Sequence, residues 1–174
     1  MNRDRICCAM DARFFMSNGK TLIRELAIVT NEKLLCFQVD TKITHMNFRD
    51  LKTNWFIQNF ITGLSLRPKH CYTSQKQARR ILRQEYYTSR RHEKDCVVIK
   101  NHQLGSLLND MCIPYICLDA CAKDKGWACI FHTEGAGCHT CALKKACDLY
   151  IHVSSASDVH GSTSFQWICY SSQR

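Results

Sequence analysis

The chain has 174 residues, of which 45% are hydrophobic and 22% charged, values typical of a globular protein with a packed core. Its 24 Lys and Arg exceed its 15 Asp and Glu, and the net charge of +9 favours phosphate-rich partners. No apolar run approaches the roughly 18 residues of a membrane span, and the N-terminus lacks the apolar core of a secretory signal. These features argue against membrane and secreted classes, and we expect an intracellular protein of the cytoplasm or nucleus.

The first 40 residues predict three antiparallel strands. Residues 6–16 are apolar enough for a buried strand, and the Asn-Gly of "SNGK" is typical of a tight hairpin turn. The pattern then predicts strands over 21–29 and 34–40, separated by the turn "TNEK". Together they form a meander.

The remainder predicts alternating helices and strands. Helices are expected over 46–64, 73–91, 102–112 and 139–153, and strands over 96–101 and 113–120. The first helix has apolar residues near helical spacing, at Phe48, Leu51, Trp55, Phe56 and Ile61, and Gly63 ends it. We expect one domain over 1–153 and a Ser-rich tail over 154–174, in which 165–170 could dock as an edge strand.

This order of elements predicts an α/β fold, a mixed sheet of three antiparallel strands followed by α-α-β-α-β-α, with helices on both faces. It resembles the ribonuclease H-like fold, which includes the DEDD family of 3′–5′ exonucleases. Those enzymes hold two divalent ions with four carboxylates, and the ions stabilise the attacking and leaving oxygens.

Most carboxylates of that exonuclease site are missing. The first strand of the family carries Asp-x-Glu, whereas this chain has Asp11 followed by Arg13; "IKNHQL" supplies no acid, and His139 is followed five residues later by Lys144. One carboxylate cannot neutralise two Mg²⁺ ions, so we expect no two-metal cleavage. A weak RNA nuclease using another route would have Asp11, Asp119, His139 and Lys144 as candidate catalytic residues.

Thirteen cysteines in a reducing compartment favour metal ligands over disulfides. Cys129-x₂-His132-x₈-Cys141 supplies three ligands of the kind that tetrahedral zinc takes. The fourth stays open among Cys117, Cys121, Cys138, His139 and a carboxylate such as Glu25. Five other cysteines are expected to be ordinary core residues: Cys7, Cys8, Cys36, Cys96 and Cys112.

The chain also resembles the Maelstrom family, whose domains are DEDDh-like, have lost the exonuclease carboxylates and carry a Glu-Cys-His-Cys zinc site. The matching motifs are "RELAIV", "CIFH" and "HTCAL", and the resemblance spans residues 6–153. It implies a structural zinc ion held by Glu25, Cys129, His132 and Cys141, with Cys121 and Cys138 as alternates. Independently, an acid at position 25 in an apolar strand needs a partner if it is buried. The alternative is that it faces solvent beside Arg24 or pairs with a lysine.

A basic helix completes the candidate sites. Cations recur along one side of residues 74–87 and continue beyond them, at Lys76, Arg79, Arg80, Arg83, Arg90 and Arg91, with His92, Tyr86 and Tyr87 nearby. Arginines beside aromatic rings can bind the phosphates and bases of unpaired RNA, although a charge run is also typical of a solvated helix face. The Maelstrom resemblance implies single-stranded RNA as a partner, together with silencing proteins.

We therefore expect a non-catalytic, zinc-stabilised, exonuclease-like domain that binds single-stranded RNA. The resemblance implies a role in small-RNA silencing of transposons, or in a mobile-element or viral setting. The alternatives are the weak RNA nuclease above and a protein-interaction adaptor whose positive charge is incidental.

Overall fold

A computed structural model of the chain describes residues 5–66, 73–118, 141–154 and 166–169. Its strands are β1 (Ile6–Ser17), β2 (Lys20–Val29), β3 (Lys33–Asp40), β4 (Thr73–Ser74), β5 (Cys96–Ile99), β6 (Tyr115–Cys117) and β7 (Gln166–Cys169). The helices are α1 (Phe48–Phe56), the π-helix η2 (Ile57–Thr62), α2 (Gln75–Ser89), α3 (His102–Asp110) and α4 (Ala142–Ser154). The predicted α/β class is confirmed. The predicted strands and helices occur in the predicted order, but the structure adds η2, which continues the first helix, and the two-residue strand β4, which precedes α2.

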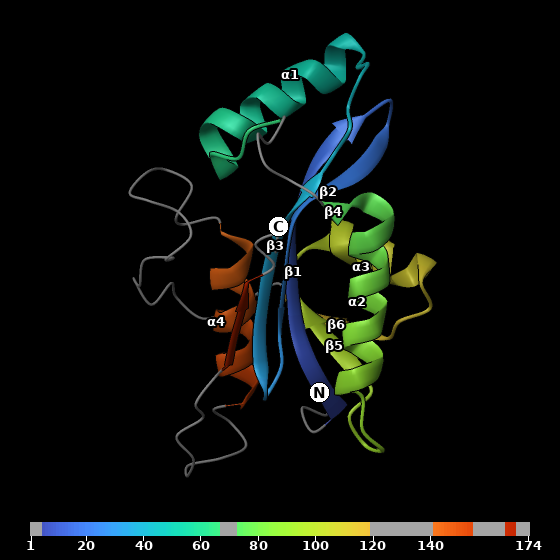
Figure 1. Cartoon of the computed structure of the whole chain (residues 1–174), viewed down its shortest axis with the longest axis vertical. Coiled ribbons are helices and arrows are strands. Elements are labelled where there is room, and N and C mark those ends of the chain that lie inside the picture. The colour runs from blue at the N-terminus through green and yellow to red at the C-terminus, as the bar shows by residue number, and fades with distance from the viewer. Residues whose placement is uncertain (1–4, 67–72, 119–140, 155–165, 170–174) are drawn as a thin grey trace.

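The strands form one mixed sheet in the order β4-β3-β2-β1-β5-β6, with β7 also paired to β3 (Figure 1). β1, β2 and β3 are antiparallel, whereas β5 and β6 run parallel to β1. The predicted hairpin turn is confirmed, because Asn18 and Gly19 have φ of 50° and 74°, the left-handed values that such a turn requires. β7 pairs in parallel with β3, as expected of a docked edge strand in the tail.

Helices cover both faces of this sheet, as predicted, and each face has its own hydrophobic cluster (Figure 1). On one face, Met10 and Ala12 of β1 pack in a cluster that includes Leu82 of α2 and Leu104 of α3. On the other face, Ala9 joins a cluster that includes residues of α4. The split follows from the alternation of side chains along a strand.

The α2 helix is anchored to its face by an apolar side. Ser74 caps it, with the Ser74 hydroxyl accepting from the Gln77 amide and the Gln77 side chain accepting from the Ser74 amide. Ala78, Leu82 and Tyr86 are buried, so the cations between them point outward.

The α1 helix has the opposite arrangement. It lies across the end of the sheet near the β1–β2 turn (Figure 1), and its buried residues are Asp50 and Asn54. The helix and its end at Gly63 are confirmed, with Gly63 at φ 67°. Its apolar residues, however, are exposed rather than packed.

Four of the five expected core cysteines are buried, namely Cys7, Cys8, Cys36 and Cys96. The expectation is wrong for Cys112, which is exposed. This residue follows α3 with a left-handed φ of 55°, and the turn carries its side chain away from the core. No helix within the described residues is long and apolar enough to cross a membrane.

Candidate functional site

A group of buried charges lies on the α4 face of the sheet. Asp11 and Arg13 alternate with core residues along β1, and Arg13 stands opposite Glu25 of β2 in the strand register. Only 1% of Asp11, 8% of Arg13 and 2% of Glu25 is exposed. An Asp11 carboxylate oxygen lies 3.1 Å from the Arg13 guanidinium. The alternative that Glu25 faces solvent is therefore wrong.

Burial and neighbouring cations act in opposite directions on Asp11. The pKa of the Asp11 carboxyl group is raised to about 6. Burial raises it, because the charged form loses hydration, and this outweighs the lowering by Arg13 and Lys145. The pKa of Lys145 in α4 is lowered from its ordinary value. Burial and the positive charge of Arg13 lower it, and Asp11 raises it. Both cations therefore favour the ionised form of Asp11, and burial opposes it.

This arrangement bears on the predicted nuclease residues. A carboxylate in contact with a guanidinium has less charge to offer a divalent ion. Lys144 is buried in the first turn of α4 and is 2% exposed. Asp119 and His139 lie outside the described residues, so the structure brings together Asp11, Arg13 and α4 but leaves the other two candidates unplaced.

Two of the four predicted zinc ligands meet at the start of α4. Glu25 Oε2 accepts a hydrogen bond of 3.1 Å from the Ala142 amide, although the two residues are 117 positions apart. Cys141 directly precedes Ala142, is 2% exposed, and its carbonyl accepts from the Lys145 amide. Cys141 therefore sits at the N-cap of α4, directly before the amide from which Glu25 accepts.

The remaining predicted ligands lie outside the described residues: Cys129, His132, the alternates Cys121 and Cys138, and His139. Within the described residues, no group of three His, Cys, Asp or Glu side chains could hold a metal ion. Cys117, another candidate for the fourth position, is half-buried in β6, and its Sγ lies 3.9 Å from Nδ1 of His102.

The predicted basic surface on α2 is exposed. Solvent reaches all six of its cations, Lys76, Arg79, Arg80, Arg83, Arg90 and Arg91. Arg91 forms an exposed ion pair of 2.9 Å with Glu32, whereas Glu85, the acid within α2, is buried and pairs with Lys33 at 2.6 Å. The exposed charge of α2 is therefore entirely positive.

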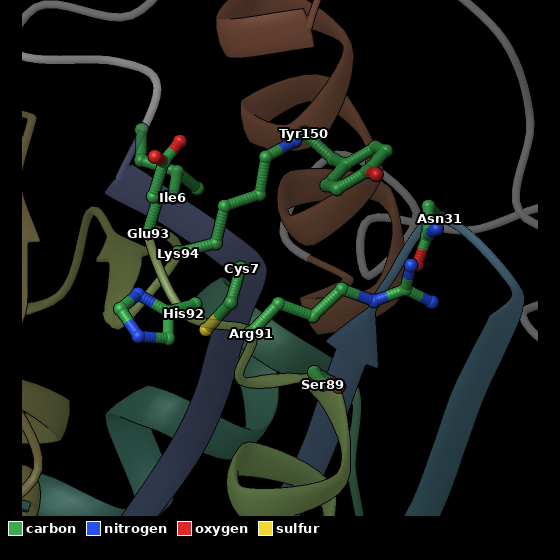
Figure 2. A pocket seen from close by; sticks show the side chains of 9 residues that line it. All are labelled: Ile6, Cys7, Asn31, Ser89, Arg91, His92, Glu93, Lys94 and Tyr150. Carbon is green, nitrogen blue, oxygen red and sulfur yellow. The ribbon is translucent and has the colours of Figure 1, made fainter.

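A pocket of about 400 Å³ lies beside the end of α2 (Figure 2). Its lining comprises Ile6, Cys7, Asn31, Ser89, Arg91, His92, Glu93, Lys94 and Tyr150. Arg91 extends toward Asn31, and Lys94 extends toward Tyr150 (Figure 2). Because Glu93 is among the lining residues and Arg91 is already paired with Glu32, the pocket has no strong charge of one sign.

Sequence reasoning missed one surface. The helical spacing predicted α1, but the spacing alone did not tell which side would face the protein. The available signal was the pair Asp50 and Asn54, which lie four residues apart on one side of the helix, away from its large apolar side chains. Buried polar groups need hydrogen-bond partners, and the β1–β2 turn supplies them.

The fold and the site define an α/β protein with a mixed sheet, a buried charge cluster on one face and exposed cations on α2. Comparison with family models, curated proteins and solved structures found no match.

Proposed function

We propose that the chain is a non-catalytic, ribonuclease H-like domain that binds single-stranded RNA and is stabilised by a structural zinc ion. The sheet order supports the fold assignment, because β3-β2-β1 are antiparallel and β5 and β6 follow in parallel to β1. The order of elements is the basis of the resemblance to the ribonuclease H-like fold and its DEDD exonucleases, whereas the Maelstrom resemblance rests on the motifs "RELAIV", "CIFH" and "HTCAL". A role in small-RNA silencing of transposons, with silencing proteins as partners, follows that resemblance.

The observation that carries RNA binding is the segregation of charge. Over residues 42–66 and 74–90, the exposed acidic and basic side chains are all cations: Lys42, Arg49, Lys52, Lys76, Arg79, Arg80, Arg83 and Arg90. Beyond them, Arg91 is paired with Glu32, and Glu93 is an exposed acid. The two acids of these segments, Asp50 and Glu85, are buried. Such a surface attracts a polyanion, and its affinity comes from displaced counterions.

The contact between Asp11 and Arg13 supports the absence of two-metal cleavage. In a carboxylate cluster, a second acid at position 13 would help to hold the metal, whereas Arg13 supplies a fixed positive charge 3.1 Å from Asp11. Lys145 adds a second cation near the same carboxylate. A divalent ion would have to displace these charges or bear their repulsion.

The start of α4 supports the zinc site. Glu25 accepts a hydrogen bond from the Ala142 amide, which brings its carboxylate to the start of α4, and carboxylates that bind a metal commonly accept such hydrogen bonds as well. Cys141 stands next to that contact. With Cys129 and His132 the set would be tetrahedral and closed, so zinc would join β2 to α4 and activate no water.

RNA binding is tested by fluorescence anisotropy with labelled single-stranded oligouridine. We expect affinity to fall with salt between about 50 and 200 mM. Replacing Arg79, Arg80 and Arg83 by Ala should make the log–log salt slope shallower by about 2, at roughly 0.7 per lost contact. Gln84→Ala on the same exposed surface is the matched control. No binding at low salt would reject the proposal.

The same RNA tests catalysis. Incubation with Mg²⁺ or Mn²⁺ should leave it intact on a sequencing gel. Fragments that form with the wild type and disappear with Asp11→Asn would show a nuclease and overturn the non-catalytic assignment.

Zinc is tested by elemental analysis of the purified chain. We expect about one zinc per chain, lost together with folding in Cys129→Ser because metal and fold are coupled. Cys112→Ser, which changes an exposed cysteine outside the proposed site, should keep its zinc. Full retention of zinc in Cys129→Ser would reject the ligand assignment.

A further inference from the structure

The outward side of α1 and η2 is an apolar surface. Its exposed residues are Phe48 (82%), Leu51 (50%), Trp55 (58%), Phe56 (52%), Phe60 (60%) and Ile61 (36%); together they are named here the aromatic face. A contiguous exposed patch of large apolar side chains marks an interaction site more often than a free surface.

Polar contacts hold the opposite side of α1 against the end of β1 and the β1–β2 turn. Asn54 Nδ2 donates to the Met16 carbonyl at 2.7 Å, and Asn54 Oδ1 accepts from the Met16 amide at 2.7 Å. Asp50 Oδ2 accepts from the Gly19 amide at 3.2 Å. The face is therefore presented in one orientation, which lowers the entropic cost of binding.

The rings on this face are close together yet accessible. Trp55 and Phe60 have centroids 5.3 Å apart with planes at 68°, and Phe56 lies 5.3 Å from Phe60 at 31°. Each of the three side chains is more than half exposed. Exposed rings on neighbouring turns can stack with successive unpaired bases.

The charges around the face are complementary to a nucleic acid. Arg49 and Lys52 of the same helix are exposed, and Asp50, the acid of α1, is buried. A second copy of the chain would bring cations of equal sign together across such a contact, which costs free energy.

We propose that the aromatic face is the base-stacking part of the single-stranded RNA site, with Arg49 and Lys52 contacting phosphates. This inference rests on the proposed RNA binding and assigns the bases to α1 and η2, whereas α2 contributes phosphate contacts. Because every base has a ring surface, binding at this face has little dependence on RNA sequence.

The test measures affinity for labelled oligouridine and its salt dependence. Trp55→Ala and Phe60→Ala should each weaken binding roughly 5- to 100-fold, as expected when one stacked base is lost. Their salt slopes should match the wild type, because no phosphate contact is removed. Ile151→Ala, an exposed apolar residue of α4, is the control and should bind as the wild type does.

A conservative pair separates stacking from general apolar contact. Trp55→Tyr keeps an aromatic ring and should retain most of the affinity, whereas Trp55→Leu keeps apolar area without a ring and should bind as weakly as Trp55→Ala. Equal affinity of Trp55→Leu and wild type would overturn the inference.

The remaining outcomes separate a failure of the aromatic face from a failure of the proposed RNA binding. Salt-sensitive RNA binding that is unchanged in Trp55→Ala and Phe60→Ala would reject the aromatic face and leave RNA binding standing. A wild type that binds no RNA would reject both. Loss of a sedimenting dimer in Trp55→Ala, with RNA affinity unchanged, would instead assign the face to contact between copies.

Discussion

The two faces of the sheet differ in what they bury. The face under α2 and α3 has a hydrophobic cluster that includes Met10, Ala12 and Leu82. The face under α4 combines a hydrophobic cluster with Asp11, Arg13 and Glu25. The first face stabilises the fold by burying apolar surface area away from water. The second contains groups that are costly to bury, and such groups mark a functional site when partners hold them in place.

Moving a charge from one face to the other is the strongest test of this difference. Met10 is fully buried and neighbours Asp11 in β1. Met10→Asp should reduce the free energy of unfolding by more than about 4 kcal/mol, because the new carboxylate would lose its hydration within a hydrophobic cluster. Circular dichroism should then show an unfolded or very unstable chain. Asp11→Asn, one residue away, should stay folded; similar stability of the two variants would contradict the contrast.

Two leucine-to-alanine substitutions, one in α2 and one in α1, compare how much the packing of each helix contributes to the free energy of unfolding. Leu82→Ala in α2 should lower the free energy of unfolding by about 2–5 kcal/mol, because the Leu82 side chain is fully buried. Leu51→Ala in α1 should change it by less than about 0.5 kcal/mol, since Leu51 is 50% exposed. Urea denaturation of both variants measures the difference. Equal losses would mean that the side of α1 carrying Leu51 is buried in solution.

The pH dependence of stability reports the charged face. The pKa of Asp11 is about 6 in the folded chain against an ordinary value of 3.8. Between these values the folded state binds more protons than the unfolded state, so stability decreases as the pH rises through this range. The loss is on the order of 3 kcal/mol.

Urea denaturation at a series of pH values, for wild type and Asp11→Asn, isolates this contribution. The difference in unfolding free energy between the two proteins should change with pH across the window and level off above it. A pH-independent difference would show that Asp11 titrates normally.

The polar anchor of α1 gives the smallest expected effect. Asn54→Ala removes two hydrogen bonds to Met16 and should cost about 1–2 kcal/mol. Hydrogen exchange of the α1 amides should accelerate. Asn59→Ala removes an exposed contact to Trp55 within the helix and should leave exchange in the rest of α1 nearly unchanged. Equal hydrogen-exchange rates of the α1 amides in the two variants would show that Asn54 does not anchor the helix.

The sequence by itself determined the elements. Alternating and helical spacing of apolar residues, the Asn-Gly turn and the Thr-Ser cap predicted β1, β2, β3 and α2 because these signals act within a few residues. They also predicted the α/β class, since three strands followed by alternating helices and strands have few packing solutions.

Only the tertiary structure decided which side of each element is buried and which residues far apart in the sequence are in contact. The spacing of the apolar residues in α1 is the same whether they face the protein or solvent. Asn54 faces the protein because its side chain donates a hydrogen bond to the Met16 carbonyl. The contact of Glu25 with Ala142 joins residues 117 positions apart, which no local pattern encodes. The pairing of Asp11 with Arg13 depended on their sharing one buried face. Burial and long-range contact fix how a charged group behaves, and both arise only when the sheet and helices have packed.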